Sequence, residues 1–159
     1  MKKYIKFINL LKEEVSNIAY QTTNIENMWF EFDSVGKTTI RKVIEFQKTE
    51  NIFFYNLALG NLTGTTEKEI DDITLSDNGD IKEIFMTVVD VIDIFFTFKP
   101  NVFVVFCGNT KQKNDIYNFL VNRYFDYLNK KYKIFGELSG GIYLYDKDRK
   151  YDKILLRKK

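Results

Sequence analysis

The sequence predicts an α+β fold: a mainly antiparallel sheet of about six strands, with an N-terminal helix and two long helices packed on it. Three observations support this prediction. Apolar residues recur at helical spacing in residues 1–24, 81–98 and 113–130. Short runs rich in β-branched and aromatic residues lie between these stretches. Turn sequences join consecutive runs as in β-hairpins, so most neighbours in the sheet should be antiparallel.

The first helical stretch is amphipathic. Its apolar residues are spaced by four and three positions: Tyr4, Ile8, Leu11, Val15 and Ile18. Such a stripe is typical of a helix that covers one face of a sheet. A second interpretation, a helix lying on a membrane surface, depends on four nearby lysines: Lys2, Lys3, Lys6 and Lys12.

Three strands are predicted next, over residues 28–32, 39–46 and 52–60. The first two flank a hairpin turn, Ser34-Val35-Gly36-Lys37. With Thr38, this turn includes the Gly-Lys-Thr ending of a phosphate-binding loop. However, the glycine required five residues before Gly36 is Glu31, and a β-branched run follows instead of a helix. The third run is nearly all apolar, which predicts a central strand buried on both faces.

Residues 61–80 form a polar connection whose acidic residues suggest a calcium loop. With Gly79 at the sixth position of an EF-hand, the twelfth position is Phe85, where a glutamate is required. We therefore predict no metal site. Instead, Asn78-Gly79 is interpreted as a turn and residues 80–83 as a capping box at the start of the next helix.

The helix over residues 81–98 ends before Pro100. From residue 84 onward it is apolar except for one polar stripe. We expect such a helix to lie between the sheet and either the N-terminal helix or a partner subunit.

The last third of the chain predicts a buried strand at 102–106 and a helix at 113–130. A hairpin follows, with strands at 133–138 and 142–145 around Ser139-Gly140-Gly141. A charged run then leads to Ile154-Leu155-Leu156 and a basic tail, for which no element is predicted.

The composition limits the chemistry. With no histidine and one cysteine, the chain lacks His-based nucleophile pairs, an internal disulfide and Cys-based metal sites, and we predict no cofactor. A net charge of +2 gives no support for nucleic-acid binding. No signal peptide is recognisable, and charged residues interrupt the apolar stretch at 81–98. We therefore predict no membrane span and expect a cytoplasmic protein.

The turn between the strand at 102–106 and the following helix is the candidate functional site. Free backbone N–H groups at a helix start favour an anion, and the turn supplies glycine, polar side chains and two cations: Gly108, Asn109, Thr110, Lys111 and Lys113. Asp71, Asp72 and Asp80 would form an acidic wall if their loop shares this edge of the sheet. The alternative is a capped helix with solvated lysines and Thr110 or Asn114 as N-cap.

Several motifs together resemble a family of small bacterial proteins catalogued as a domain of unknown function. They are Tyr55-Asn56-Leu57-Ala58-Leu59-Gly60, Ile70-Asp71-Asp72, Asn78-Gly79-Asp80, Thr87-Val88-Val89, Gly108-Asn109-Thr110 and Ile116-Tyr117. The resemblance covers residues 28–145 of a single domain spanning 1–159, and residues 1–24 lie outside it as a helical extension.

The resemblance implies a fold unit and no activity. In the family pattern a serine follows the glycine of the strand-to-helix turn, and two arginines flank a threonine. Here those positions are Asn109, Lys113, Asn114 and Asp115, so one cation is kept and an acid replaces the other.

The function favoured by these observations is a binding module with a weak anion or phosphate site at residues 108–113. One alternative is a protein-interaction or regulatory component, a homodimer or one with a partner encoded in the same operon, as in toxin–antitoxin or defence operons. Another is an enzyme that uses carboxylates and Mg²⁺ on a phosphate-containing substrate. Without histidine or a recognised catalytic motif, the sequence does not favour catalysis.

Overall fold

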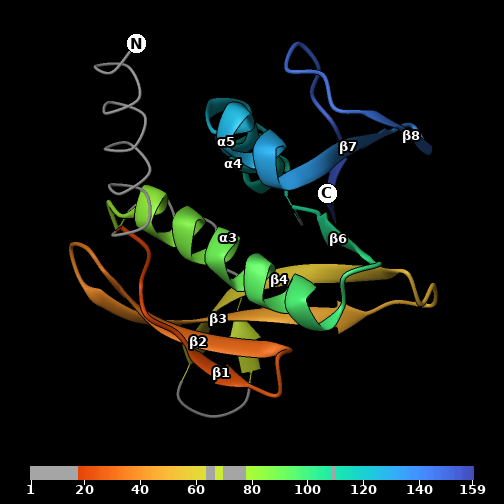
Figure 1. The fold of residues 1–159 in the computed structure, drawn as a ribbon. Coiled ribbons are helices and arrows are strands. Elements are labelled where there is room, and N and C mark those ends of the chain that lie inside the picture. Colours follow the sequence, from red (N-terminus) through yellow and green to blue (C-terminus); the bar gives the residue numbers. More distant parts are fainter. Residues whose placement is uncertain (1–17, 64–66, 70–77, 109) are drawn as a thin grey trace, which may run out of the picture.

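The computed structural model describes residues 18–63, 67–69, 78–108 and 110–159. In these residues nine strands form one mixed sheet in the order β1-β2-β3-β4-β6-β9-β7-β8, with β5 pairing to β4 (Figure 1). The strands are β1 (Thr23–Ile25), β2 (Trp29–Val35), β3 (Thr39–Lys48), β4 (Phe54–Thr63), β5 (Glu67–Glu69), β6 (Phe103–Phe106), β7 (Tyr132–Leu138), β8 (Gly141–Leu144) and β9 (Lys153–Lys158). The helices are α3 (Ile81–Phe98), α4 (Lys111–Arg123) and α5 (Phe125–Lys131).

The predicted architecture is therefore wrong in two respects. The sheet is larger than six strands, and it is mixed because β4 and β6 pair in parallel. The second long helix is two helices, broken at Tyr124, whose ring stacks on Phe85 of α3. Residues 1–17 of the predicted N-terminal helix lie outside the described residues, and within 18–24 the chain is not helical and enters β1.

The first four strands form an antiparallel meander. The Gly-Lys-Thr segment lies in the β2–β3 hairpin turn, as predicted. A Cβ on Gly36 would lie 1.8 Å from the carbonyl oxygen of Asn78, so only glycine lets this turn pack against residue 78. β4 is not buried on both faces as predicted: Tyr55, Leu57 and Leu59 enter the core, whereas Asn56 is exposed.

α3 has the predicted bounds. Most of its apolar residues are buried within the chain, in a core shared with the sheet and with residues 18–20, whereas Phe98 at its end is exposed. The backbone N–H of Tyr20 donates to Oγ1 of Thr87 on α3 at 2.8 Å. The capping box predicted at its start is wrong, because the Asp80 side chain makes no cap hydrogen bond and is held elsewhere. None of the described helices is long and apolar enough to cross a membrane.

The strand β9 was not predicted, yet it lies inside the sheet between β6 and β7. Charged residues on both sides obscure its short apolar run. Ile154 and Leu156 enter the core, while Leu155 lies on the other face. β9 is antiparallel to both neighbours, so β6 and β7 run parallel to each other on either side of it.

The sheet thus has two different faces. Residues of α3, α4 and α5 share one core cluster with strand residues such as Leu57, Phe106 and Ile154 (Figure 1). The opposite face, called here the second face, carries the alternate side chains. Strand register places four of them in one row: Asn56, Val105, Leu155 and Phe135.

Candidate functional site

A gap in strand pairing lies next to the start of α4. One edge of β4 pairs with β6 through residues 54–57 and with β5 through residues 61–63. Residues 58–60 lie between these two partners, with no strand beside that edge in the described part of the chain. The chain leaves β6 at this level and turns into α4, so the end of β6, the start of α4 and the middle of β4 come together.

The turn itself is built for helix capping. Thr110 is the N-cap of α4, and its Oγ1 accepts a hydrogen bond from the backbone N–H of Lys113 at 3.2 Å. A Cβ on Gly108 would lie 2.4 Å from the backbone nitrogen of Asn114. Glycine at this position therefore lets the chain cross the first turn of its own helix. Asn109 lies outside the described residues.

The two lysines of the turn occupy different environments. Lys111 is exposed to solvent. Lys113 is only 2% exposed, and its Nζ lies 5.8 Å from the centre of the Tyr117 ring. Lys113 also lines a hollow of ≈ 200 Å³ with six other residues: Gln47, Asn56, Leu57, Ala58, Val105 and Cys107. Of the predicted cations, Lys113 is therefore the one associated with a cavity.

A second hollow, of ≈ 370 Å³, adjoins the first, and both are lined by Asn56 and Val105. It is lined further by the β3–β4 turn and by β4, β7 and β9, through Thr49, Glu50, Asn51, Phe54, Glu137, Lys153 and Leu155. We call the two hollows together the second-face groove. It runs from Lys113 to the Lys153–Glu137 ion pair, whose charged atoms are 3.9 Å apart.

Asn56 lies at the centre of this groove. Its side chain is exposed and makes no hydrogen bond to any residue in the described ranges. Neighbouring polar groups are engaged: the Gln47 side-chain amide donates to Glu45 at 3.1 Å, and Thr49 Oγ1 donates to the carbonyls of Asn51 and Phe54. An uncommitted amide offers both donors and an acceptor to a ligand.

Of the predicted acidic wall, the structure describes only Asp80. Asp71 and Asp72 lie outside the described residues. Asp80 is only 3% exposed, and its Oδ2 accepts hydrogen bonds from Ser34 Oγ at 2.5 Å and from the Tyr20 hydroxyl at 2.7 Å. In the sheet order, Ser34 lies on β2, separated by β3 and β4 from β6.

Asp80 instead belongs to a buried polar cluster, the Asp80 cluster, formed with Tyr20, Ser34 and Asn78. The Asn78 amide donates to Ser34 Oγ at 2.8 Å, and its Oδ1 accepts from the backbone N–H of Thr38 at 3.0 Å. Burial, together with the hydrogen bond to Asp80, raises the pKa of Tyr20 to about 12. The cluster joins the β2–β3 hairpin to the start of α3.

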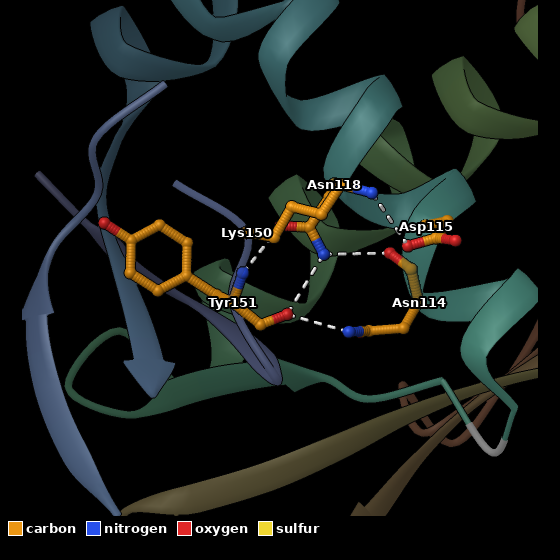
Figure 2. A network of polar contacts seen from close by, with 5 residues as sticks. All are labelled: Asn114, Asp115, Asn118, Lys150 and Tyr151. Carbon is orange, nitrogen blue, oxygen red and sulfur yellow. Dashed lines mark hydrogen bonds and ion pairs between the residues drawn. The ribbon is translucent and has the colours of Figure 1, made fainter. Parts of the chain in front are cut away.

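The positions that follow Lys113 have structural contacts (Figure 2). Side-chain amides of Asn114 and Asn118 donate to the carbonyl of Tyr151 at 2.7 and 3.1 Å, and the Tyr151 N–H donates to Asn118 Oδ1 at 3.0 Å. Asp115 pairs with Lys150 at 3.4 Å. These contacts hold the segment before β9 against α4, and Thr110 rather than Asn114 is the N-cap.

One protein-family model matches most of the chain. The model of DUF6934, described as a family of unknown function, matches residues 16–159. The chain belongs to this family. No curated protein and no solved structure matches the chain. The DUF6934 match extends beyond residues 28–145 at both ends, so it includes β1 and the inserted strand β9.

Sequence reasoning about this DUF6934 protein identified Lys113 but missed most of the groove. Asn56 had one signal: it is the only polar residue among residues 52–59, an apolar run. Val105 and Leu155 had no such signal, because their place in the row with Asn56 depends on two non-local pairings, of β4 with β6 and of β6 with β9. In this DUF6934 protein, the motif at residues 55–60 and the turn at residues 108–110 meet beside the gap in strand pairing.

Proposed function

We propose that the protein is a binding module for a small phosphorylated ligand, which lies along the second-face groove with its phosphate at the Lys113 end. The observation that carries this proposal is that the two hollows share Asn56 and Val105 in their linings, with Lys113 lining one of them. A cleft of this size on a sheet is typical of a small-molecule site.

The charges in the groove support this orientation of the ligand. Glu50 lines the larger hollow, where it would repel a phosphate, and Glu137 and Lys153 beside it are paired with each other; the smaller hollow is lined by one charged residue, Lys113. A lysine with low solvent exposure binds an anion more strongly than an exposed one, because water screens the interaction less. The start of α4 adds a positive dipole end nearby.

Ribose 5-phosphate is a suitable first probe, with affinity measured by isothermal titration calorimetry. We expect Lys113→Gln to weaken binding by about tenfold or more, because a hydrogen bond to a charged group contributes about 1.5–3 kcal/mol. Lys111→Gln is the matched control, since it removes an exposed charge two residues away. It should change the affinity by less than about twofold at 0.15 M salt.

Melting curves show whether Lys113→Gln remains folded. If that variant fails to fold, Asn56→Asp replaces it, because Asn56 is exposed and an added carboxylate there should repel the phosphate. Equal affinity of the wild type and a folded Lys113→Gln variant would overturn the proposal, as would a wild type that binds no ribose 5-phosphate at millimolar concentration.

A further inference from the structure

We infer that the larger hollow of the second-face groove takes a planar heteroaromatic ring, so that the ligand class is a nucleotide with its base against Phe54 and Asn56. This inference depends on the proposed function for the phosphate end. It concerns a different part of the groove, formed by residues with no part in the strand-to-helix turn.

Phe54 supplies an aromatic wall for such a ring. It is half-buried, lines the hollow, and stacks on Phe103 with ring centres 5.1 Å apart and planes 12° apart. Phe103 is held in turn by the Phe135 ring at 5.8 Å and by the Arg157 guanidinium at 5.5 Å. A ring fixed in this way on one side presents a preformed surface for stacking on the other.

Two apolar residues lie at the base of the hollow, whose other lining residues are mostly polar. Val105 and Leu155 line it from β6 and β9, and they are 5% and 1% exposed. They lie in one register row with Asn56, so the floor follows the sheet surface. A flat ring that lies across this row keeps its edges in reach of polar groups while its face stays on apolar atoms.

Asn56 supplies the polar recognition. Its amide carries a donor and an acceptor side by side, the arrangement that pairs with the edge of a nucleobase such as adenine. Asparagine is uncommon inside strands, and here it lies on a central strand without a hydrogen-bond partner in the described part of the chain. Packing within the sheet gives no reason for an amide at this position.

The charged rim selects against other ligands. Glu50 disfavours an anionic group inside the larger hollow, which leaves it to a neutral part of the ligand. Lys153 is already paired with Glu137, so its charge is largely compensated. A phosphate at Lys113 and a base at Phe54 would then lie on opposite sides of Asn56, which lines both hollows.

The test compares three kinds of probe: the four ribonucleoside monophosphates, the four corresponding nucleosides, and ribose 5-phosphate. Calorimetry should show at least one nucleotide binding about tenfold or more tightly than ribose 5-phosphate, as expected for base stacking on an aromatic ring. Phe54→Leu should remove most of this difference while leaving ribose 5-phosphate affinity unchanged, and Asn56→Val should also weaken nucleotide binding. Lys113→Gln should weaken both kinds of phosphorylated probe.

Two exposed residues outside the groove provide matched controls, Phe53→Leu for the ring and Asn101→Ala for the amide. Neither should alter any affinity. If nucleotides and ribose 5-phosphate bind equally well and Phe54→Leu has no effect, the base site is overturned while the phosphate end stands. If nucleosides bind as tightly as nucleotides and Lys113→Gln has no effect, the phosphate end fails and the base site stands.

Discussion

Two polar regions of this protein invite comparison: the Asp80 cluster and the second-face groove. The Asp80 cluster is buried, and its hydroxyl and amide groups bond to one another and to the β2–β3 hairpin. In the groove, the central polar residue, Asn56, is exposed and has no partner in the described ranges. Asp80 Oδ1 is buried without a hydrogen-bond partner among the described residues. The hydroxyl and amide groups that bond to one another stabilise the fold, whereas an exposed amide without a partner is available to a ligand.

The comparison also separates two motifs that look equally functional in the sequence. The acidic Asn78-Gly79-Asp80 segment invites an active-site interpretation, yet its described contacts join two parts of the fold. The apolar segment at residues 55–60 resembles an ordinary core strand, yet it carries the central residue of the groove.

The largest effect is expected from Asp80→Ala, which tests the structural side of this comparison. Loss of the Asp80 carboxylate leaves the Ser34 and Tyr20 hydroxyls without their acceptor. The substitution should lower the free energy of unfolding by about 3 kcal/mol. For a protein of this size, that corresponds to a melting temperature roughly 6–12 °C lower. Calorimetry or circular dichroism would measure the change.

Asp115→Ala is the matched control for Asp80→Ala. Asp115 forms an ion pair with Lys150 in which both side chains are largely solvent-accessible, and such pairs contribute at most about 1 kcal/mol. Ribose 5-phosphate affinity should be the same in both variants as in the wild type. A loss of ligand affinity in a folded Asp80→Ala protein would mean that the cluster belongs to the binding site and that the two regions are not separate.

Alkaline pH is expected to act on the same cluster through Tyr20. Its pKa is raised from 10.0 to about 12 in the folded protein, so the folded state holds this proton more tightly than the unfolded state. The contribution of Tyr20 to the free energy of unfolding should therefore be constant below pH 10 and should be lost as the pH rises from 10 towards 12. The free energy of unfolding from urea titrations would show this decline.

Tyr20→Phe isolates that contribution, because other buried tyrosines also titrate in this range. The pKa of Tyr145, for example, is raised to about 12, first by burial and then by Tyr151 and Asp146. The variant should be less stable than the wild type at pH 8, and its stability should fall less steeply above pH 10. Parallel pH profiles of the two proteins would contradict the assignment.

Local patterns predicted much of the fold, and non-local pairing explains the failures. The bounds of α3, the β2–β3 and β7–β8 hairpins and Thr110 as an N-cap follow from periodicity and turn chemistry within a few residues. The insertion of β9 joins residues about fifty positions apart, through pairs such as Val105 with Leu155. No local pattern encodes that pairing, on which the groove floor depends, or the parallel pairing of β4 with β6 that makes the sheet mixed.

The candidate site was predictable to the same extent. Lys113 follows a recognisable strand-to-helix turn, so its residue type and position could be identified. The burial of Lys113 and the exposure of Lys111 could not be predicted, because burial depends on where β4 and β6 place the first turn of α4. The contacts of Asp80 could not be predicted either, because its side chain bonds to a hairpin from an earlier part of the chain.

The smallest expected change in stability, and one of opposite sign, comes from Asn56→Val. Valine fits a pleated sheet better than asparagine, and Asn56 has no described hydrogen bond to lose, so the variant should be more stable by about 0.5–1 kcal/mol. Its affinity for the nucleotide that binds the wild type should nevertheless fall. A residue whose removal stabilises the fold but weakens binding is kept for binding rather than for packing.

Urea unfolding and calorimetry on the same preparation would measure both effects. A destabilised variant would show instead that Asn56 supports the sheet, as Asp80 supports the β2–β3 hairpin, and the contrast between the two regions would be lost.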